Sequence, residues 1–199
     1  MVDNHVPDGR RDAGSVAILS HMDALQRLGY EVAFVPADLS LLDAPGLATL
    51  AATGVQCYGL PLFASVEEVL RREAGSFGLI YLHHLPNAAR YTSLVRHYCS
   101  NARLIYGVAD LHHLRTRRQE LVEERGELVA AAGRIRFAEF MAAWAAAAVI
   151  THSETEAALL RNALPGVRVH VVPWSVASVM GPRWSSSKCI QSPVSCFCP

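Results

Sequence analysis

Apolar and polar residues alternate along the chain in blocks that predict helices and strands in turn. Short apolar runs are typical of buried strands, and stretches with an apolar residue every three or four positions are typical of helices. Strands joined by helical crossovers predict a mostly parallel sheet with helices on both faces, so we expect a Rossmann-like α/β fold. The expected strands are 31–35, 55–58, 77–82, 104–108, 147–151 and 167–172, and the expected helices are 15–28, 45–53, 65–74, 87–98, 114–146 and 153–163.

The long helical stretch 114–146 contains two glycines that are expected to break or kink it. Gly126 and Gly133 each cost about 1 kcal/mol relative to alanine inside a helix. Phe140 and Trp144 follow at helical spacing, and we expect both side chains in the core.

The two ends of the pattern differ from the middle. Before the first helix only a stub of strand, 1–3, precedes a loop, so we expect the first central strand to be largely missing. A buried gap there would leave backbone groups of the neighbouring strands unpaired. Residues 177–199 have no apolar period and are rich in serine, cysteine and proline. We therefore expect one domain over residues 1–176, incomplete at its start, and an irregular, disordered tail.

Composition excludes several classes of protein. Half of the residues are apolar, 51%, and 18% are charged, which is typical of a packed globular domain. The 18 basic and 18 acidic side chains cancel, so no overall positive field favours nucleic acid. No apolar run is long enough to span a membrane, and no apolar signal core follows Met1. We expect a cytoplasmic protein in which Cys57 and Cys99 are small core residues; peripheral contact with a membrane stays open.

Four segments carry a family resemblance: VDNHVPDGRRDAGS, LGYEVAFVPADL, IYGVADLHHLRTRRQE and AVITHSETEAALLRNALPGVRVHVVPW. In this order, between residues 2 and 176, they resemble the N-terminal domain of family-four glycosyltransferases with the GT-B fold. Such enzymes have two facing Rossmann-like domains, the first for the acceptor and the second for the nucleotide-sugar donor. The resemblance implies retaining sugar transfer from a nucleotide-sugar donor to a glycan or lipid-linked acceptor, without metal, cofactor or nucleic acid. The paired glutamates of the donor domain have no counterpart here, so we expect no transferase activity from this chain alone.

The strongest candidate for chemistry is the segment RLIYGVADLHHLRTRR at 103–118. In parallel sheets, ligands bind in the crevice beyond the carboxyl ends of the strands, and Asp110, His112 and His113 follow an expected strand directly. A carboxylate or neutral imidazole there can accept the proton of an acceptor hydroxyl, so these three are the candidate catalytic residues. Adjacent side chains point in different directions, so we expect only one imidazole in the crevice. Alternatively, Asp110 caps the next helix and one histidine packs beneath it.

The loop Asp12-Ala13-Gly14-Ser15 begins the first helix and is a candidate substrate-binding site. Free backbone N–H groups at a helix N-terminus bind anions, and Gly14 permits close approach of a ligand. The resemblance implies that this loop lies near the sugar diphosphate. The simpler alternative is that Asp12 or Ser15 only caps the helix.

His83, His84 and Arg115 are further candidates for substrate binding. The two histidines end an expected strand, and a structural role is an equal alternative. Several histidines near one crevice suggest a metal, but no carboxylate is spaced along the sequence to complete a site, so we expect none. Arg115 lies on an opening helix turn, where cations are disfavoured. This placement suggests an acidic or phosphorylated acceptor, although pairing with the glutamates of the same helix also explains it.

Two other functions compete with sugar transfer. A non-catalytic, flavodoxin-like module would bind a ligand or a partner chain, and its histidines would be structural. A dinucleotide-dependent enzyme is disfavoured because the chain has no GxGxxG sequence.

Overall fold

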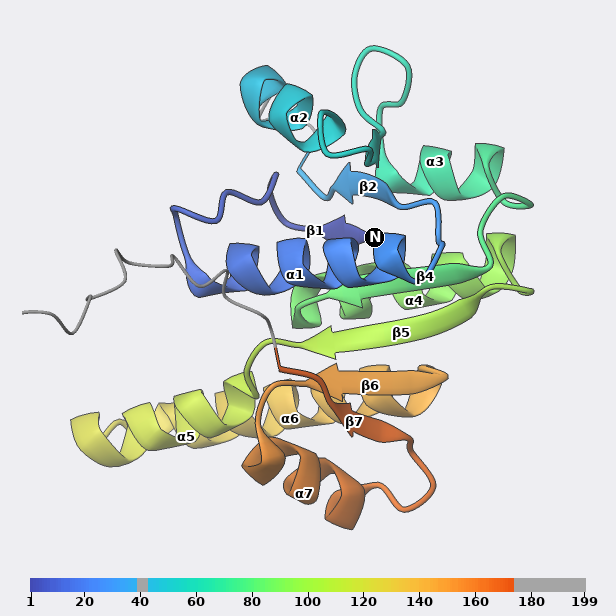
Figure 1. Cartoon of the computed structure of the whole chain (residues 1–199). Coiled ribbons are helices and arrows are strands. Elements are labelled where there is room, and N and C mark those ends of the chain that lie inside the picture. The colour runs from blue at the N-terminus through green and yellow to red at the C-terminus, as the bar shows by residue number, and fades with distance from the viewer. Residues whose placement is uncertain (39–42, 174–199) are drawn as a thin grey trace, which may run out of the picture.

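The computed structural model describes residues 1–38 and 43–173, which form an α/β domain (Figure 1). The expected tail, with three of the five cysteines, lies outside the described residues, as do the last three residues of the expected domain. The described strands are β1 (Val2–Asp3), β2 (Ala33–Pro36), β3 (Gln56–Cys57), β4 (Leu79–His83), β5 (Arg103–Val108), β6 (Ala148–Thr151) and β7 (Val169–Val171). The described helices are α1 (Ala13–Arg27), α2 (Ala44–Ala51), α3 (Val66–Arg72), α4 (Leu85–Tyr98), α5 (His112–Glu123), α6 (Glu127–Ala145) and α7 (Glu154–Ala163).

The strands form one parallel sheet in the order β3-β2-β1-β4-β5-β6-β7. This confirms the predicted Rossmann-like α/β class. The connections lead outward from β1 toward β3 and from β4 toward β7. The order therefore reverses between β1 and β4, where open α/β sheets have their ligand crevice.

The central strand β1 is the predicted stub. Its two residues pair with both neighbours, Val2 with Val35 and Leu82, and Asp3 with Pro36. The ammonium group of Met1 extends this pairing by donating a hydrogen bond to the carbonyl of Ala33, at 2.6 Å. The short strand still brings Asp3 to the edge at which the other strands end.

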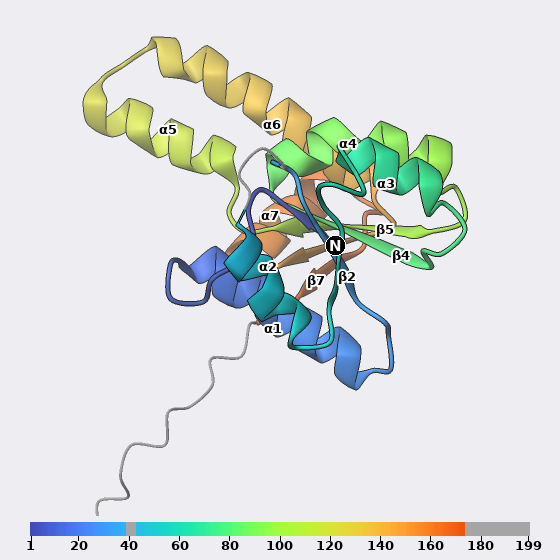
Figure 2. The ribbon, with the colours of Figure 1, turned by 90° about the horizontal axis from the view of Figure 1, so that it is seen from above.

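Two separate apolar clusters cover the two faces of the sheet. Residues of α1 and α2 pack with β2 in one cluster, and residues of α3, α4, α6 and α7 pack with β4, β5 and β6 in the other. Figure 2 shows α3, α4 and α6 on one side of the strands and α1 on the other. Because side chains alternate along a strand, Ile80 and Leu82 face the second cluster, and Tyr81 and His83 face α1.

The stretch 114–146 is two helices rather than one. α5 ends at Glu123, and the cap residue Glu124 has the left-handed backbone conformation, with φ of 52°. The break thus lies next to Gly126, one of the two glycines at which a break was predicted. The other, Gly133, lies inside α6. α5 and α6 form a hairpin that projects from the body of the domain (Figure 2).

The core prediction holds for most of the residues that it named. Cys99 is buried and Cys57 is half-buried, as expected of small core residues. Phe140 packs against the core, but the prediction for Trp144 is wrong: this side chain is 70% exposed, since it lies on the face of α6 that no other described helix covers. Among the described helices, none has the length and apolar character needed to cross a membrane.

Candidate functional site

Four strands bring their carboxyl ends to one edge of the domain. Val2 pairs with Leu82, His83 with Gly107, and Val108 with Thr151, so the segments that follow β1, β4, β5 and β6 begin side by side. These segments carry most of the residues that the sequence singles out. The edge therefore includes the crevice between β1 and β4, where the strand order reverses.

Asp110 lies at the centre of an ion-pair cluster on this edge. Its two carboxylate oxygens lie 3.0 Å from His112 Nε2 and 3.0 Å from an Arg115 guanidinium nitrogen. The carboxylate thereby fixes the orientation of the imidazole and compensates the cation at the start of α5. The residue at the cap position of α5 is Leu111, so Asp110 precedes the cap residue of this helix.

The two imidazoles of the pair at 112–113 point apart, as predicted. His113 Nδ1 contacts the carboxylate of Glu139 on α6, which also accepts the backbone N–H of His112 at 2.6 Å. Glu139 is fully buried. Sequence reasoning missed this residue, although an isolated acid in the otherwise apolar run FAEFMAAW was a usable signal.

The segment Asp12–Ser15 caps α1 and lies beside His84. Asp12 caps the helix, since its carboxylate accepts the Ser15 N–H at 2.7 Å and the Ser15 hydroxyl at 3.1 Å. Gly14 faces the neighbouring loop: a Cβ built on it would lie 3.6 Å from His84 Nε2. The loop therefore borders the crevice, with Gly14 as its point of contact.

His84 occupies the middle of the edge in a strained backbone conformation. Its φ of 66° and ψ of 153° belong to a region that residues other than glycine rarely adopt. Burial, followed by the nearby His112 imidazole, lowers the pKa of His84. The side chain is 24% exposed, so it offers a neutral imidazole to the crevice.

Beneath His84 lies a buried group of histidine and tyrosine side chains. The Tyr81 hydroxyl lies 3.1 Å from His21 Nδ1 and 3.4 Å from His83 Nδ1. Burial, with His84 as the next cause, lowers the pKa of His83 to about 2, and burial followed by His152 lowers the pKa of His21 to about 4. His83 has no exposed surface, so of the two histidines that end β4 only His84 meets solvent.

A carboxylate accompanies these histidines after all. Asp3, at the end of β1, lies with one oxygen 3.7 Å from His84 Nε2. Each of three residues offers one potential ligand atom, and these atoms lie within 4.8 Å of one another: Asp3, His83 and His84. The prediction that no carboxylate accompanies these imidazoles is therefore wrong. Asp3 is far from them in the sequence, but β1 and β4 are neighbours in the sheet. Burial raises the pKa of Asp3 to about 7.

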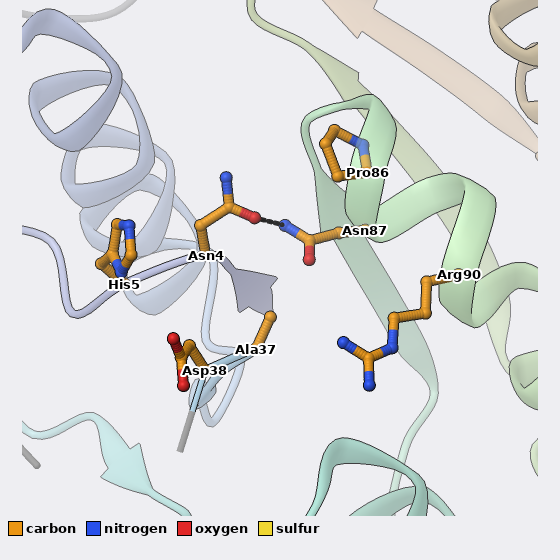
Figure 3. A pocket seen from close by; sticks show the side chains of 7 residues that line it. All are labelled: Asn4, His5, Ala37, Asp38, Pro86, Asn87 and Arg90. Carbon is orange, nitrogen blue, oxygen red and sulfur yellow. Dashed lines mark hydrogen bonds between the residues drawn. The ribbon is translucent and has the colours of Figure 1, made fainter. Parts of the chain in front are cut away.

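An open pocket of about 510 Å³ adjoins the edge at the β1 and β2 loops (Figure 3). One wall carries Asn87 and Arg90 of α4. The opposite wall carries Asn4 and Asp38, and the Asn87 amide donates to Asn4 across the pocket at 3.0 Å. The lining is thus mostly polar, with both donors and acceptors. The full lining is Asn4, His5, Ala37, Asp38, Pro86, Asn87 and Arg90.

No family model matches this chain, and no curated protein matches it in a sequence search. The function of the domain is therefore inferred from its residues and their geometry.

Proposed function

We propose that this domain binds the acceptor side of a glycosyl-transfer reaction, in a glycosyltransferase that uses a nucleotide-sugar donor. The sugar or lipid-linked acceptor occupies the polar pocket of Figure 3 and extends along the strand edge toward His112. The single observation that carries this proposal is the position of this pocket next to the β1–β4 crevice, on the same strand edge as the oriented Asp110–His112 pair.

The pocket lining suits a polyhydroxyl ligand. Carboxylate, amide and guanidinium groups offer hydrogen-bond acceptors and donors in several directions, as a sugar with neighbouring hydroxyl groups requires. Arg90 adds a positive charge on the α4 wall, which favours an acceptor that carries a phosphate or carboxylate. A flat apolar ligand would shield these polar groups from water without offering them a hydrogen bond.

The Asp110–His112 pair supplies the chemistry that the acceptor needs. His112 can accept a hydrogen bond from the hydroxyl group of the acceptor. Asp110 orients the imidazole from its other nitrogen, with a carboxylate oxygen 3.0 Å from Nε2. Because Nε2 faces Asp110, His112 meets the hydroxyl through Nδ1. Gly14 and Arg115 border the same edge and suit the phosphate oxygens of a donor.

Ligand-observed NMR and titration calorimetry test the proposal directly on this chain. The probes are a maltooligosaccharide, UDP-glucose, GDP-mannose and uridine diphosphate. We expect the maltooligosaccharide to bind, and Arg90→Ala and His112→Ala to weaken its binding at least about tenfold. Arg118→Ala is the matched control, since this exposed arginine on α5 lies outside the pocket lining and the Asp110 ion-pair cluster.

Two results would overturn the proposal. Binding of uridine diphosphate alone, with no contribution from any sugar, would favour the non-catalytic flavodoxin-like module. Carbohydrate binding that survives both Arg90→Ala and His112→Ala would remove the pocket and the strand edge from the site.

A further inference from the structure

The structure assigns Asp3, His83 and His84 to a binding site for one divalent transition-metal ion of the zinc class. Two imidazole nitrogens and one carboxylate oxygen form a ligand set that such ions favour. The inference is independent of the proposed function, because it concerns these three side chains and not the sugar.

The three side chains lie close together without hydrogen bonds to one another. The ligand atoms of the three side chains lie within 4.8 Å of one another, yet the Asp3–His84 distance of 3.7 Å is too long for a hydrogen bond. Three polar groups have therefore been gathered at the centre of the sheet without satisfying one another. A cation between them would satisfy all three after small side-chain shifts.

One of the three side chains has a buried nitrogen without a hydrogen-bond partner. His83 has no exposed surface, and its Nε2 has no hydrogen-bond partner among the described residues. A buried polar atom of this kind costs about 1–3 kcal/mol unless something binds it. A metal ion is a suitable partner, because the lone pair of a neutral imidazole is what it binds.

The other ring nitrogen of His83 is supported from behind by Tyr81. Metal-binding histidines commonly hold their second ring nitrogen in a hydrogen bond that fixes the tautomer. His83 Nδ1 lies 3.4 Å from the Tyr81 hydroxyl, which in turn lies 3.1 Å from His21 Nδ1. If Tyr81 donates to His21 and accepts from His83, the lone pair of His83 is on Nε2.

The site would be open on one side. His84 is 24% exposed, whereas Asp3 and His83 are buried. Three protein ligands leave a fourth position for water or for an oxygen atom of a bound molecule. The ligand expected there is an oxygen donor such as a phosphate or a hydroxyl group.

Cobalt(II) titration followed by visible absorption tests this assignment. Cysteine thiolates also bind such ions, so Cys189→Ser, Cys196→Ser and Cys198→Ser are combined in the starting protein. We expect one Co²⁺ per chain, and a loss of affinity of at least about tenfold in Asp3→Asn and His84→Ala. His170→Ala, which removes an exposed histidine of β7, is the matched control and should leave the affinity unchanged.

Two further measurements separate ligation from a structural role. Tyr81→Phe removes only the hydroxyl behind His83 and should weaken Co²⁺ binding by about tenfold. In protein with no substitution at the site, Zn²⁺ should shift the ring-nitrogen resonances of His83 and His84 but not of His170. The assignment is overturned if Co²⁺ does not bind, if affinity is unchanged in His84→Ala and Asp3→Asn, or if Zn²⁺ leaves the two resonances in place. None of these titrations contains a sugar, so their outcome is independent of the carbohydrate experiment.

Discussion

The Tyr81 hydroxyl occupies the space that a side chain at Gly107 would need. These residues lie on neighbouring strands, and a Cβ built on Gly107 would be 2.5 Å from Tyr81 Cζ. The ring cannot move away easily, because it is buried and its hydroxyl contacts His21 and His83. The absence of a side chain at 107 is therefore a condition for the buried histidine–tyrosine group.

Substitution of Gly107 should destabilise the fold. We expect Gly107→Ala to lower the free energy of unfolding by about 1–3 kcal/mol, because overpacking displaces the Tyr81 ring. Urea denaturation measures the change. Gly133→Ala is the matched control: a Cβ there meets no described atom within 4 Å, and in the middle of α6 it should stabilise by about 0.5–1 kcal/mol. Equal stabilities of the two variants would contradict the close packing.

Backbone strain at His84 leads to a second prediction. Glycine adopts φ of 66° and ψ of 153° at little cost, whereas alanine does not. We expect His84→Gly to be more stable than His84→Ala by about 1 kcal/mol, measured by chemical denaturation. Both variants lack the imidazole, so the comparison isolates the backbone. If alanine were the more stable of the two, the strain would have been relieved elsewhere.

Glu139 should be the most costly of the tested acidic residues to replace. Glu139→Leu leaves the His112 N–H and the His113 ring without their acceptor, and we expect a loss of about 3 kcal/mol. Glu139→Gln keeps an oxygen for the N–H and should cost about 1 kcal/mol. Thermal and urea unfolding provide the measurement.

A surface ion pair is the control for Glu139. Glu154 is 76% exposed and lies 3.4 Å from Arg161. Glu154→Gln should leave the stability nearly unchanged, since exposed pairs contribute little. A similar loss in Glu139→Leu and Glu154→Gln would show that the buried carboxylate does not hold α5 in place.

Acid should destabilise the protein in part through His21. Its pKa is lowered to about 4, so the unfolded chain takes up a proton between about pH 6.5 and pH 4 that the folded chain does not. The contribution of neutral His21 to stability is complete above about pH 6.5 and is lost as the pH falls from there toward pH 4. His21→Asn keeps a polar atom near the Tyr81 hydroxyl but does not titrate.

The experiment compares slopes rather than absolute stabilities. Urea denaturation at several values between pH 7 and pH 4.5 should show a smaller loss in His21→Asn than in the parent, by about 1 kcal/mol after allowance for screening. His152 stacks on His21 and must be retained in both proteins. Parallel curves would mean that His21 takes up its proton equally well in the folded state.

Most of the fold is predictable from the sequence, because strands buried on both faces appear as short apolar runs between amphipathic helices. The stub at β1 was also expected. The helix break was placed only approximately, since the residue in the left-handed conformation is Glu124, which carries no sequence signal for it. Trp144 was misplaced because helical spacing alone does not say which face another helix covers.

For the candidate site too, local sequence pattern predicts some of the residues and misses others. Asp110, His112 and His84 were predictable because each directly follows a strand, and parallel strands end at one edge. Asp3, Glu139 and the pocket were not, because their partners are distant in the chain: Asn4 and Asn87, for example, are 83 residues apart. Such pairs depend on which strands become neighbours, and strand order is not encoded in local periodicity.

The buried carboxylate of Glu139 ties the start of α5 to the interior of the domain. It accepts the His112 N–H and contacts the His113 ring from α6, which itself packs against α4. Glu156 of α7 accepts the Leu111 N–H at 3.0 Å. The position of His112 is therefore set by two helices that lie outside the pocket, so a substitution in their packing would disturb this edge without touching a pocket residue.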